Sequence, residues 1–336
     1  MSAHLLLLDC GPQASVQDGG RPGFQRQGLS PSGPMDALAM AAANALAGNP
    51  AGTAVLELAL AGARLRAVGG PVWLALAGAP FGISVEGEPM ADHRSFTLSE
   101  GAELVLTPPR TGVFACLAVA GGLDLPDILG SRAFHRRAGL GGLENRSLRA
   151  GDRIPVASAD SRRERALAPL PLDADEPVRV VLGPQQERFT QGGIATLLGA
   201  AFTVSGQADR MGIALEGPAV EHGPEGFNIV SDATVFGSVQ VPGSGRPIVL
   251  MADRQTTGGY PKIATVISAD LRRLAQRRPG DAVRFRAVSV AEAVRQARAR
   301  AAFTDALGAN LLPVSTREER LMEANVAGAA VDAFEA

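Results

Sequence analysis

Short apolar runs, separated by glycine and proline, follow one another along most of this chain of 336 residues. Residues 55–60 and 72–76 alternate in side-chain character, which is typical of short strands. Residues 112–119 are almost continuously apolar, which indicates a strand that is buried on both faces or closes a barrel. The pattern predicts a mostly β fold with short helices.

The clearest helical pattern covers residues 35–47. Pro34 suits the start of a helix, Asp36 favours its N-terminal dipole, and Gly48, with a proline two residues later, ends it. Asn44 lies inside this alanine-rich stretch, so its amide needs partners from nearby backbone or from a site. Further helices are expected from Ser268 to residue 276, from the capping box Ser289–Glu292 to about residue 302, and over residues 316–327.

A polar segment, residues 159–177, contains three prolines and has no periodicity, so we interpret it as a linker. It separates a first domain, residues 1–158, from a second domain, residues 178–290. Residues 291–336 would form a helical C-terminal extension, appended to the core. Gly-Pro-Gln follows the first strand of each half, at residues 11–13 and 183–185, which favours two similar β domains produced by duplication.

Charge and composition exclude several classes of protein. The formal net charge of −2 argues against nucleic acid or an anionic membrane as the main partner. No apolar run approaches the roughly 18 residues that span a membrane, and the first residues lack a signal-peptide pattern, so a cytoplasmic protein is expected. The two cysteines and four histidines have no metal-binding spacing, so we predict no metal site.

The main candidate site is the polar loop of residues 253–262, between two apolar runs. It contains the only tyrosine of the chain, Tyr260, and the only lysine, Lys262. A lysine in a chain that otherwise uses arginine suggests a need for a compact ammonium group with an adjustable pKa. Gly258 and Gly259 would allow positive φ or close approach to a ligand, although a surface turn could carry the same pair. The other candidate residues of this loop are Asp253, Arg254, Thr256 and Thr257.

Polar residues in three other segments extend the candidate site. A glycine-rich loop after the first strand contains Gln17, Asp18 and Arg21. Asp18 and Arg21 could form a structural ion pair or contact a ligand. Arg210 follows an aspartate in a loop of the second half, and Gln240 lies near the end of a strand predicted over residues 236–241.

Several common catalytic motifs are absent from the sequence. It has no P-loop, no strand–GxGxxG–helix unit and no GxSxG motif. Lys262 follows a proline and is the only lysine, so the chain has no evident biotin-acceptor or Schiff-base motif. If ATP or biotin enters the reaction, a partner is expected to supply its machinery.

Several of these loops together resemble the biotin-dependent carboxyltransferase family, which is also called allophanate hydrolase subunit two. The resemblance covers about residues 5–293, with the motifs in the expected order. They are residues 15–23, 32–36, 43–44, 48–49, 118–122, 130–132, 209–212 and 253–262. The Gly-Gly pair after Asp18 is a mild departure from the family pattern, and the tail after about residue 303 has no family motif.

The resemblance implies two tandem cyclophilin-like β-barrel domains and a partner protein that resembles the other half of the carboxyltransferase domain. Free-standing bacterial members act as the C subunit of an ATP-dependent 5-oxoprolinase, which opens the 5-oxoproline lactam to L-glutamate. Their partners resemble the other two components of that enzyme, the B subunit, which is the other half-domain, and the deacetylase-like A subunit. The alternative activity moves carboxylate from carboxybiotin to urea or a related amide, and only this alternative requires biotin. A regulatory protein that binds and sequesters a partner is a third hypothesis.

Both activities require stabilisation of negative charge on an amide-like or ureido oxygen. We expect Lys262 and Arg254 to supply positive charge, with Asp253 beside them. Tyr260 and Gln240 would donate hydrogen bonds or position the substrate. Arg210 could hold a substrate carboxylate through two hydrogen bonds. The remaining substrate-binding candidates are Gln17, Asp18, Arg21, Thr256, Thr257, Gly258 and Gly259.

Overall fold

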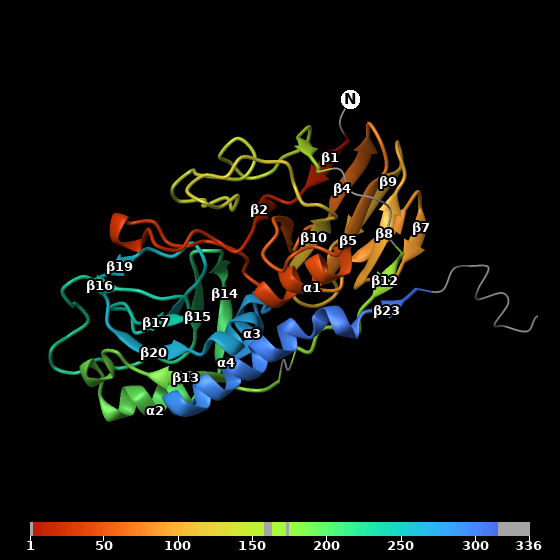
Figure 1. Ribbon diagram of the computed structural model, residues 1–336. Coiled ribbons are helices and arrows are strands. Elements are labelled where there is room, and N and C mark those ends of the chain that lie inside the picture. Colours follow the sequence, from red (N-terminus) through yellow and green to blue (C-terminus); the bar gives the residue numbers. More distant parts are fainter. Residues whose placement is uncertain (1–2, 158–162, 173–174, 315–336) are drawn as a thin grey trace, which may run out of the picture.

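The computed structural model describes residues 3–157, 163–172 and 175–314. The first part of the chain forms two facing sheets, and the second part forms one strongly curved sheet (Figure 1). The long helix α4 (Val290–Asp305) runs along both. The predicted mostly β fold with short helices is confirmed, and the sheet of the second part is nearly closed into a barrel.

Each sheet of the first domain contributes one wall of an apolar core. The six-stranded sheet consists of β11 (Arg153–Pro155), β1 (His4–Cys10), β4 (Ala63–Val68), β9 (Glu103–Thr107), β6 (Gly82–Val85) and β7 (Glu88–Met90). The seven-stranded sheet consists of β2 (Ser15–Gln17), β3 (Val55–Ala59), β10 (Phe114–Val119), β5 (Val72–Gly78), β8 (Arg94–Leu98), β12 (Arg165–Ala166) and β23 (Leu312–Pro313).

Strand β10 is buried along its whole length, as its apolar sequence predicts. Its residues Leu117 and Val119 enter the core between the sheets, whereas Cys116 and Ala118 face helix α1 (Ala37–Ala47). Because successive side chains of a strand point to opposite faces, the small residues Cys116 and Ala118 lie together on the helix side. There they allow the alanine-rich helix to pack closely against the sheet.

Helix α1 begins two residues later than predicted. Asp36 is its N-cap, and its Oδ1 accepts a hydrogen bond from the amide of Ala39 at 3.0 Å. The helix ends at Gly48, which adopts the left-handed conformation. Asn44 is fully buried and donates to the carbonyls of Ala51 and Thr53, so it holds local backbone.

The second domain is a nearly closed barrel. In sheet order its strands are β21 (Ala282–Val283), β14 (Phe202–Ala208), β15 (Gly212–Glu216), β18 (Ile248–Leu250), β17 (Ser238–Gln240), β20 (Lys262–Val266), β13 (Val178–Leu182) and β22 (Phe285–Ala287). The edge strands β21 and β22 are separated in the chain by Arg284 alone, so the sheet curves until its edges approach each other. A hairpin of β16 (Asp232–Ala233) and β19 (Thr257–Gly258) stands beside the barrel.

Helices and single turns cover the second domain. They are α2 (Gln191–Gly199), α3 (Leu271–Ala275), and the 3₁₀ turns η2 (Gln186–Arg188) and η3 (Ser268–Asp270). Two further 3₁₀ turns, η1 (Gln25–Gln27) and η4 (Leu307–Asn310), lie outside the second domain. Helix α2 was not predicted, because its sequence QGGIATLLG contains three glycines, which are poor helix formers. Helix α4 begins at the predicted capping box, where Ser289 accepts a hydrogen bond from the amide of Glu292.

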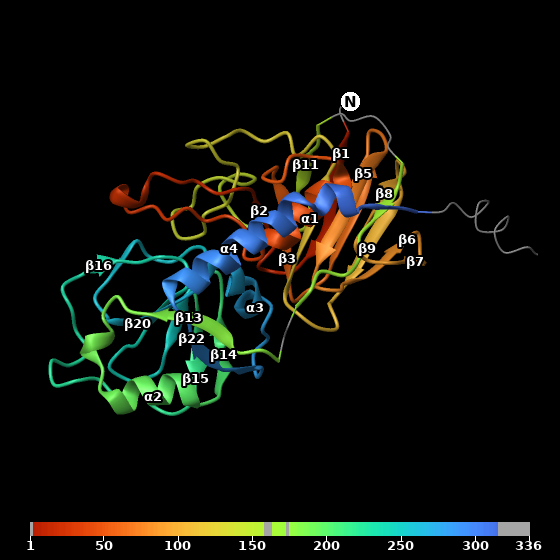
Figure 2. The ribbon, with the colours of Figure 1, turned by 60° about the horizontal axis from the view of Figure 1, so that its bottom comes forward.

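Two segments differ from the expectation of a linker and an appended C-terminal extension. Residues 165–166 form β12 and residues 312–313 form β23, and these strands pair with each other at the edge of the first domain. Leu307 is buried in the same cluster as α1. The C-terminal segment therefore returns to the first domain after α4 (Figure 2). The helix predicted over residues 316–327 lies outside the described residues.

Candidate functional site

The candidate site lies where β17 and β20 end beside the β16–β19 hairpin. Gln240 at the end of β17 pairs with Lys262 at the start of β20, across a shift in strand register. A register shift of this kind, a β-bulge, changes the direction of the side chains beside it. They bring together two residues that are 22 positions apart in sequence, both predicted as members of the site.

Lys262 is 2% exposed, and its ammonium lies 3.0 Å from Oδ2 of Asp232. Asp232 is the only partner that the described residues offer this ammonium group. An ammonium group carries three donors, and burying them without acceptors costs free energy. The amine of Lys262 therefore has spare donor capacity in a largely dry position.

Asp232 is the carboxylate partner of this lysine, with a side chain that is 48% exposed. Lys262 lowers the pKa of Asp232, and Gln185 assists. Gln185 holds both residues in place, because its Nε2 donates to Asp232 Oδ2 at 2.8 Å and its Oε1 accepts from the Lys262 amide at 3.0 Å. The carboxylate thus remains ionised beside the ammonium well below neutral pH.

Asp232 and Gln185 were not predicted as site residues. Asp232 stands in a loop without a recognisable motif, and Gln185 is visible in the sequence only as part of the repeated Gly-Pro-Gln. Both are brought to Lys262 by long-range strand pairing, β16 with β19 and β13 with β20. In the sequence, only its place as the single charged residue of its loop could have indicated that Asp232 belongs to the site.

The glycine pair of the loop has ordinary backbone geometry. Gly258 and Gly259 do not adopt positive φ, so that part of the expectation is wrong. A Cβ atom at Gly258 would lie 3.4 Å from Gln240 Oε1 and 3.5 Å from Gln255 Nε2, which are ordinary van der Waals distances. That oxygen accepts a hydrogen bond from Gln255 at 3.3 Å. The two glutamine amides therefore lie next to the main chain at Gly258.

Main-chain groups of the same loop support the hairpin. The carbonyl of Thr256 accepts from the Thr234 amide, and the carbonyl of Gly259 accepts from the Ile229 amide. Thr257 is exposed within β19, and the ring of Tyr260 is partly exposed beside it in the chain. The structure thus brings Thr256, Thr257 and Tyr260 to the rim of the site.

Arg254 is buried but has few hydrogen-bond partners. Its Nη1 reaches the Met251 carbonyl at a long 3.4 Å, its Nε has no partner among the described residues, and its guanidinium lies 6.0 Å from the centre of the Phe236 ring. Burial lowers the pKa of Arg254 to about 10, against the attraction of Asp253. A buried guanidinium with unused donors is a second source of positive charge in this loop.

Asp253 and Arg210 form a structural cluster at the junction of the two domains. Arg210 donates to Asp253 through Nε at 2.9 Å and Nη2 at 3.0 Å, to Glu57 through Nη1, and to the carbonyl of Gly33 through Nη2 at 2.6 Å. Ser32 Oγ also donates to Asp253 at 2.6 Å. The guanidinium lacks the free pair of donors that a substrate carboxylate needs, which corrects the role expected for Arg210.

Gln17, Asp18 and Arg21 also anchor the protein itself. Arg21 is fully buried and donates to three main-chain carbonyls, those of Ile128, Ser131 and Ala133. Asp18 accepts from the amides of Gly20 and Arg132 and from the hydroxyl of Ser131, and Gln17 donates to the carbonyl of Phe134. Neither of the two expected roles for Asp18 and Arg21, a mutual ion pair or a ligand contact, matches these bonds.

The hydrogen bonds of Gln17, Asp18 and Arg21 hold a long loop of the first domain that extends to the second domain. The loop of residues 18–34 reaches toward β16 and β19 in both views (Figures 1 and 2). Gln25 at its tip donates to the carbonyl of Thr234 at 3.4 Å. The first domain therefore contacts the hairpin that carries Asp232.

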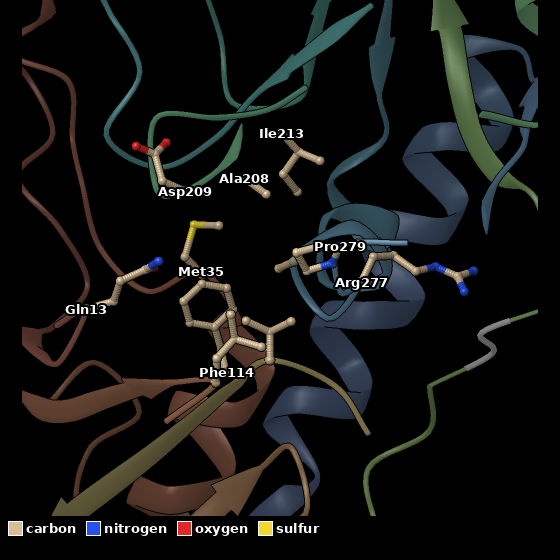
Figure 3. Close-up of a pocket in the computed structure, with 11 residues that line it drawn as sticks. Gln13, Met35, Phe114, Ala208, Asp209, Ile213, Arg277 and Pro279 are labelled. Carbon is tan, nitrogen blue, oxygen red and sulfur yellow. The ribbon is translucent and has the colours of Figure 1, made fainter. Parts of the chain in front are cut away.

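A crevice also opens at the domain junction, away from Lys262. It is lined by Met35, Phe114, Ile213 and the side chains around them (Figure 3). Its volume is about 30 Å³, which is close to the volume occupied by one water molecule in the liquid. This crevice, whose lining also includes Gln13, Asp209 and Arg277, is too small for a substrate.

The described residues contain no group of three or more His, Cys, Asp or Glu side chains that could hold a metal ion. Burial raises the pKa of the Cys10 thiol to about 11, with Asp9 and Asp152 contributing, so this cysteine is unreactive at neutral pH. No helix in this part of the chain has the length and apolar character required to cross a membrane.

Comparisons with known proteins give the chain a family context. The family model described as carboxyltransferase domain, subdomain A and B, matches residues 27–287. The C subunit of the Haemophilus influenzae 5-oxoprolinase is 37% identical over 300 residues, which cover 89% of this chain and 96% of that protein.

Two solved structures extend the comparison. The crystal structure of TTHA0988 has a TM-score of 0.77 and 38% identity, covering 85% of this chain and 55% of the other. The Kluyveromyces lactis urea carboxylase has a TM-score of 0.83 and 25% identity, covering 93% of this chain and 30% of the enzyme. The chain thus spans about half of TTHA0988 and nearly the whole of the Haemophilus protein.

Proposed function

Because the chain belongs to the family of carboxyltransferase domains built from subdomains A and B, we propose that it is the C subunit of an ATP-dependent 5-oxoprolinase. In this role it opens the lactam ring of 5-oxoproline to give L-glutamate. Its two partners resemble the B and A subunits of that enzyme. ATP is consumed by the complex, which acts in the cytoplasm.

The observation that carries this proposal is the buried amine of Lys262 with its single carboxylate contact. As a lactam opens, negative charge develops on the carbonyl oxygen. A fixed cation in a dry site stabilises that charge more than water does. Lys262 supplies the cation, Asp232 and Gln185 orient it, and Gln240 contributes an amide beside it.

Arg254 and Tyr260 complete the polar rim in this proposal. Arg254 adds positive charge from the same loop, because its guanidinium retains unused donors. Tyr260 offers a hydroxyl at the partly exposed edge, where substrate and partner would meet. Asp253 does not contact the substrate and instead fixes the start of the loop through Arg210 and Ser32.

The dependence on a partner is supported by the surface next to the site. Four apolar side chains are exposed on the loop of residues 227–235 and on its neighbour, namely Phe227, Val230, Val235 and Tyr260. Val230 is 93% exposed. Apolar side chains gathered beside a polar site are typical of a surface that another protein covers. We infer that the partner resembling the other half of the carboxyltransferase domain contacts this surface.

The alternative is carboxyl transfer from carboxybiotin to urea or a related amide, and the fold of the urea carboxylase supports it. Relative length favours the first activity, since this chain matches 96% of the Haemophilus protein and 30% of the urea carboxylase. The same buried lysine would serve either reaction, because both place negative charge on a carbonyl or ureido oxygen.

Glutamate release from 5-oxoproline and ATP tests the proposal, with the purified chain alone and mixed with both partner proteins. Activity is expected only in the mixture. Lys262→Met should reduce it by at least about 100-fold, as expected for the loss of one charge-stabilising donor, while partner binding is retained. Carboxyl transfer that requires biotin, in place of glutamate release, would support the alternative. Partner binding without turnover in either assay would indicate a sequestering protein.

A further inference from the structure

A larger cavity lies between the first domain, the segment of residues 169–172 and helix α3 of the second domain. Its volume is about 270 Å³, close to the lower end of the range of small-molecule sites. None of its lining residues belongs to the site around Lys262. Much of the wall is apolar and consists of Ala79, Pro80, Pro169, Leu170 and Leu172.

Asp92 is the carboxylate of this cavity, and it has no basic partner of its own. Its side chain is 33% exposed, and among the described residues no lysine or arginine lies within ion-pair distance of it. Its ion-pair contact is with the next residue, His93, whose Nδ1 lies 3.4 Å from Asp92 Oδ2. The contact with His93 lowers the pKa of Asp92, against the effect of burial. Asp92 is therefore ionised at neutral pH and can accept further hydrogen bonds.

His93 holds this carboxylate from a buried position. Its side chain is 4% exposed, and its Nε2 accepts a hydrogen bond from the Gly78 amide at 3.4 Å, which places the ring proton on Nδ1, beside Asp92. The carbonyl of His93 accepts from the Leu167 amide at 2.8 Å. Its φ of 51° is uncommon for a residue with a Cβ atom, and such backbone is found more often at ligand sites than elsewhere.

The one positive charge in the lining does not compensate Asp92, because it is already neutralised. Arg272 donates through Nε to Asp36 Oδ2 at 2.8 Å and through Nη1 to a main-chain carbonyl. Gln276 uses both ends of its amide, for Asp36 and for main-chain groups of the first domain. The uncompensated charge of the lining is therefore the negative charge of Asp92.

We propose that this cavity binds a small organic ammonium ion, with its charged group on Asp92 and its apolar part against Pro80, Pro169 and Leu170. A carboxylate and an ammonium group form a charge-assisted hydrogen bond, and their attraction is stronger in a partly enclosed cavity than in bulk water. The apolar wall suits the organic part of such a ligand. A single carboxylate does not provide the several oxygen ligands that calcium requires, so the chemistry favours an amine over a metal ion.

The test uses the full chain and two probes of similar shape, benzylamine and benzyl alcohol, which differ in charge at neutral pH. Isothermal titration calorimetry at constant ionic strength measures both. Wild type is expected to bind benzylamine at least tenfold more tightly than benzyl alcohol. Asp92→Asn should weaken benzylamine binding at least tenfold and leave benzyl alcohol binding unchanged. Glu88→Gln is the matched control, because Glu88 is an exposed carboxylate of the same domain outside the cavity lining.

A second variant tests the cavity itself without removing the charge. Thr111 is exposed and lines the cavity, so the larger side chain of Thr111→Phe should obstruct it and weaken the binding of both probes at least tenfold. The melting temperature without probe should remain that of wild type in this variant. The proposal is overturned if wild type does not bind benzylamine or binds both probes equally. It is also overturned if Asp92→Asn or Thr111→Phe binds benzylamine as wild type does, or if Glu88→Gln weakens binding as much as Asp92→Asn.

Discussion

At the scale of single residues, the chain concentrates its unusual chemistry at Lys262. Arginine would not replace it easily, because a guanidinium is larger and planar, whereas the space beside Asp232 and Gln185 holds a compact ammonium. The lysine and Gln240 could be predicted because they stand out in the sequence. Asp232 and Gln185 could not, since only the folded strands bring them within 3.0 Å of Lys262 atoms.

Asp232→Asn tests the role of the carboxylate. The change removes the charge that fixes the ammonium but keeps a similar shape, and Asp232 is too exposed to be important for stability. We expect glutamate release by the complex to fall more than tenfold, with a melting temperature within about 2 °C of wild type. Asp305→Asn, at an exposed position on α4, serves as the control. Equal activity in both variants would show that Asp232 does not position the lysine.

At the scale of elements, local signals predicted the ends of helices better than the ends of strands. Ser289 and Glu292 mark the start of α4 because a capping box is formed by residues close in sequence. Strands β12 and β23 contain two residues each, too few to produce a periodic pattern. They exist because distant segments pair at the edge of a sheet, and this information is not local.

Leu307→Ala tests whether the segment after α4 is part of the core. Leu307 is 2% exposed and packs with α1, so we expect a loss of about 2–5 kcal/mol in the free energy of unfolding. Leu312→Ala is the matched control, since that side chain is 57% exposed and should change stability by less than about 0.5 kcal/mol. Both are measured by urea-induced unfolding. Equal losses would mean that the segment is not anchored at Leu307.

At the scale of the whole molecule, buried polar clusters join the two domains. Arg210 links Glu57 of the first domain to Asp253 of the second, and Asp36 accepts from Arg272 and Gln276. The sequence indicates charged loops but not which charged residues contact one another. Glu57 and Asp253 each lie more than 40 positions from Arg210, so no local pattern connects them. The clusters hold the loop of residues 253–262 against the first domain, so domain packing and site geometry depend on each other.

Arg210→Met provides a test of this dependence through pH. In wild type, burial would raise the pKa of Asp253, but Arg210 holds it below its usual value. The carboxylate therefore stabilises the fold above pH about 4, and this contribution is lost as the pH falls through the folded pKa. Burial already raises the pKa of Glu57 in wild type, although Arg210 opposes it. Without Arg210, burial dominates at both carboxyl groups, so the pKa values of Asp253 and Glu57 should rise above those in wild type.

The sign of the pH effect distinguishes wild type from the variant. A carboxyl group with a raised folded pKa stabilises the fold when protonated, and that contribution is lost as the pH rises through the folded pKa. The stability difference between wild type and Arg210→Met should therefore grow from pH 5 to pH 8, reaching about 3–5 kcal/mol. Thermal unfolding across this range measures it. A difference that stays constant with pH would mean that Arg210 contributes through packing alone and that the charges of Glu57 and Asp253 do not hold the domains together.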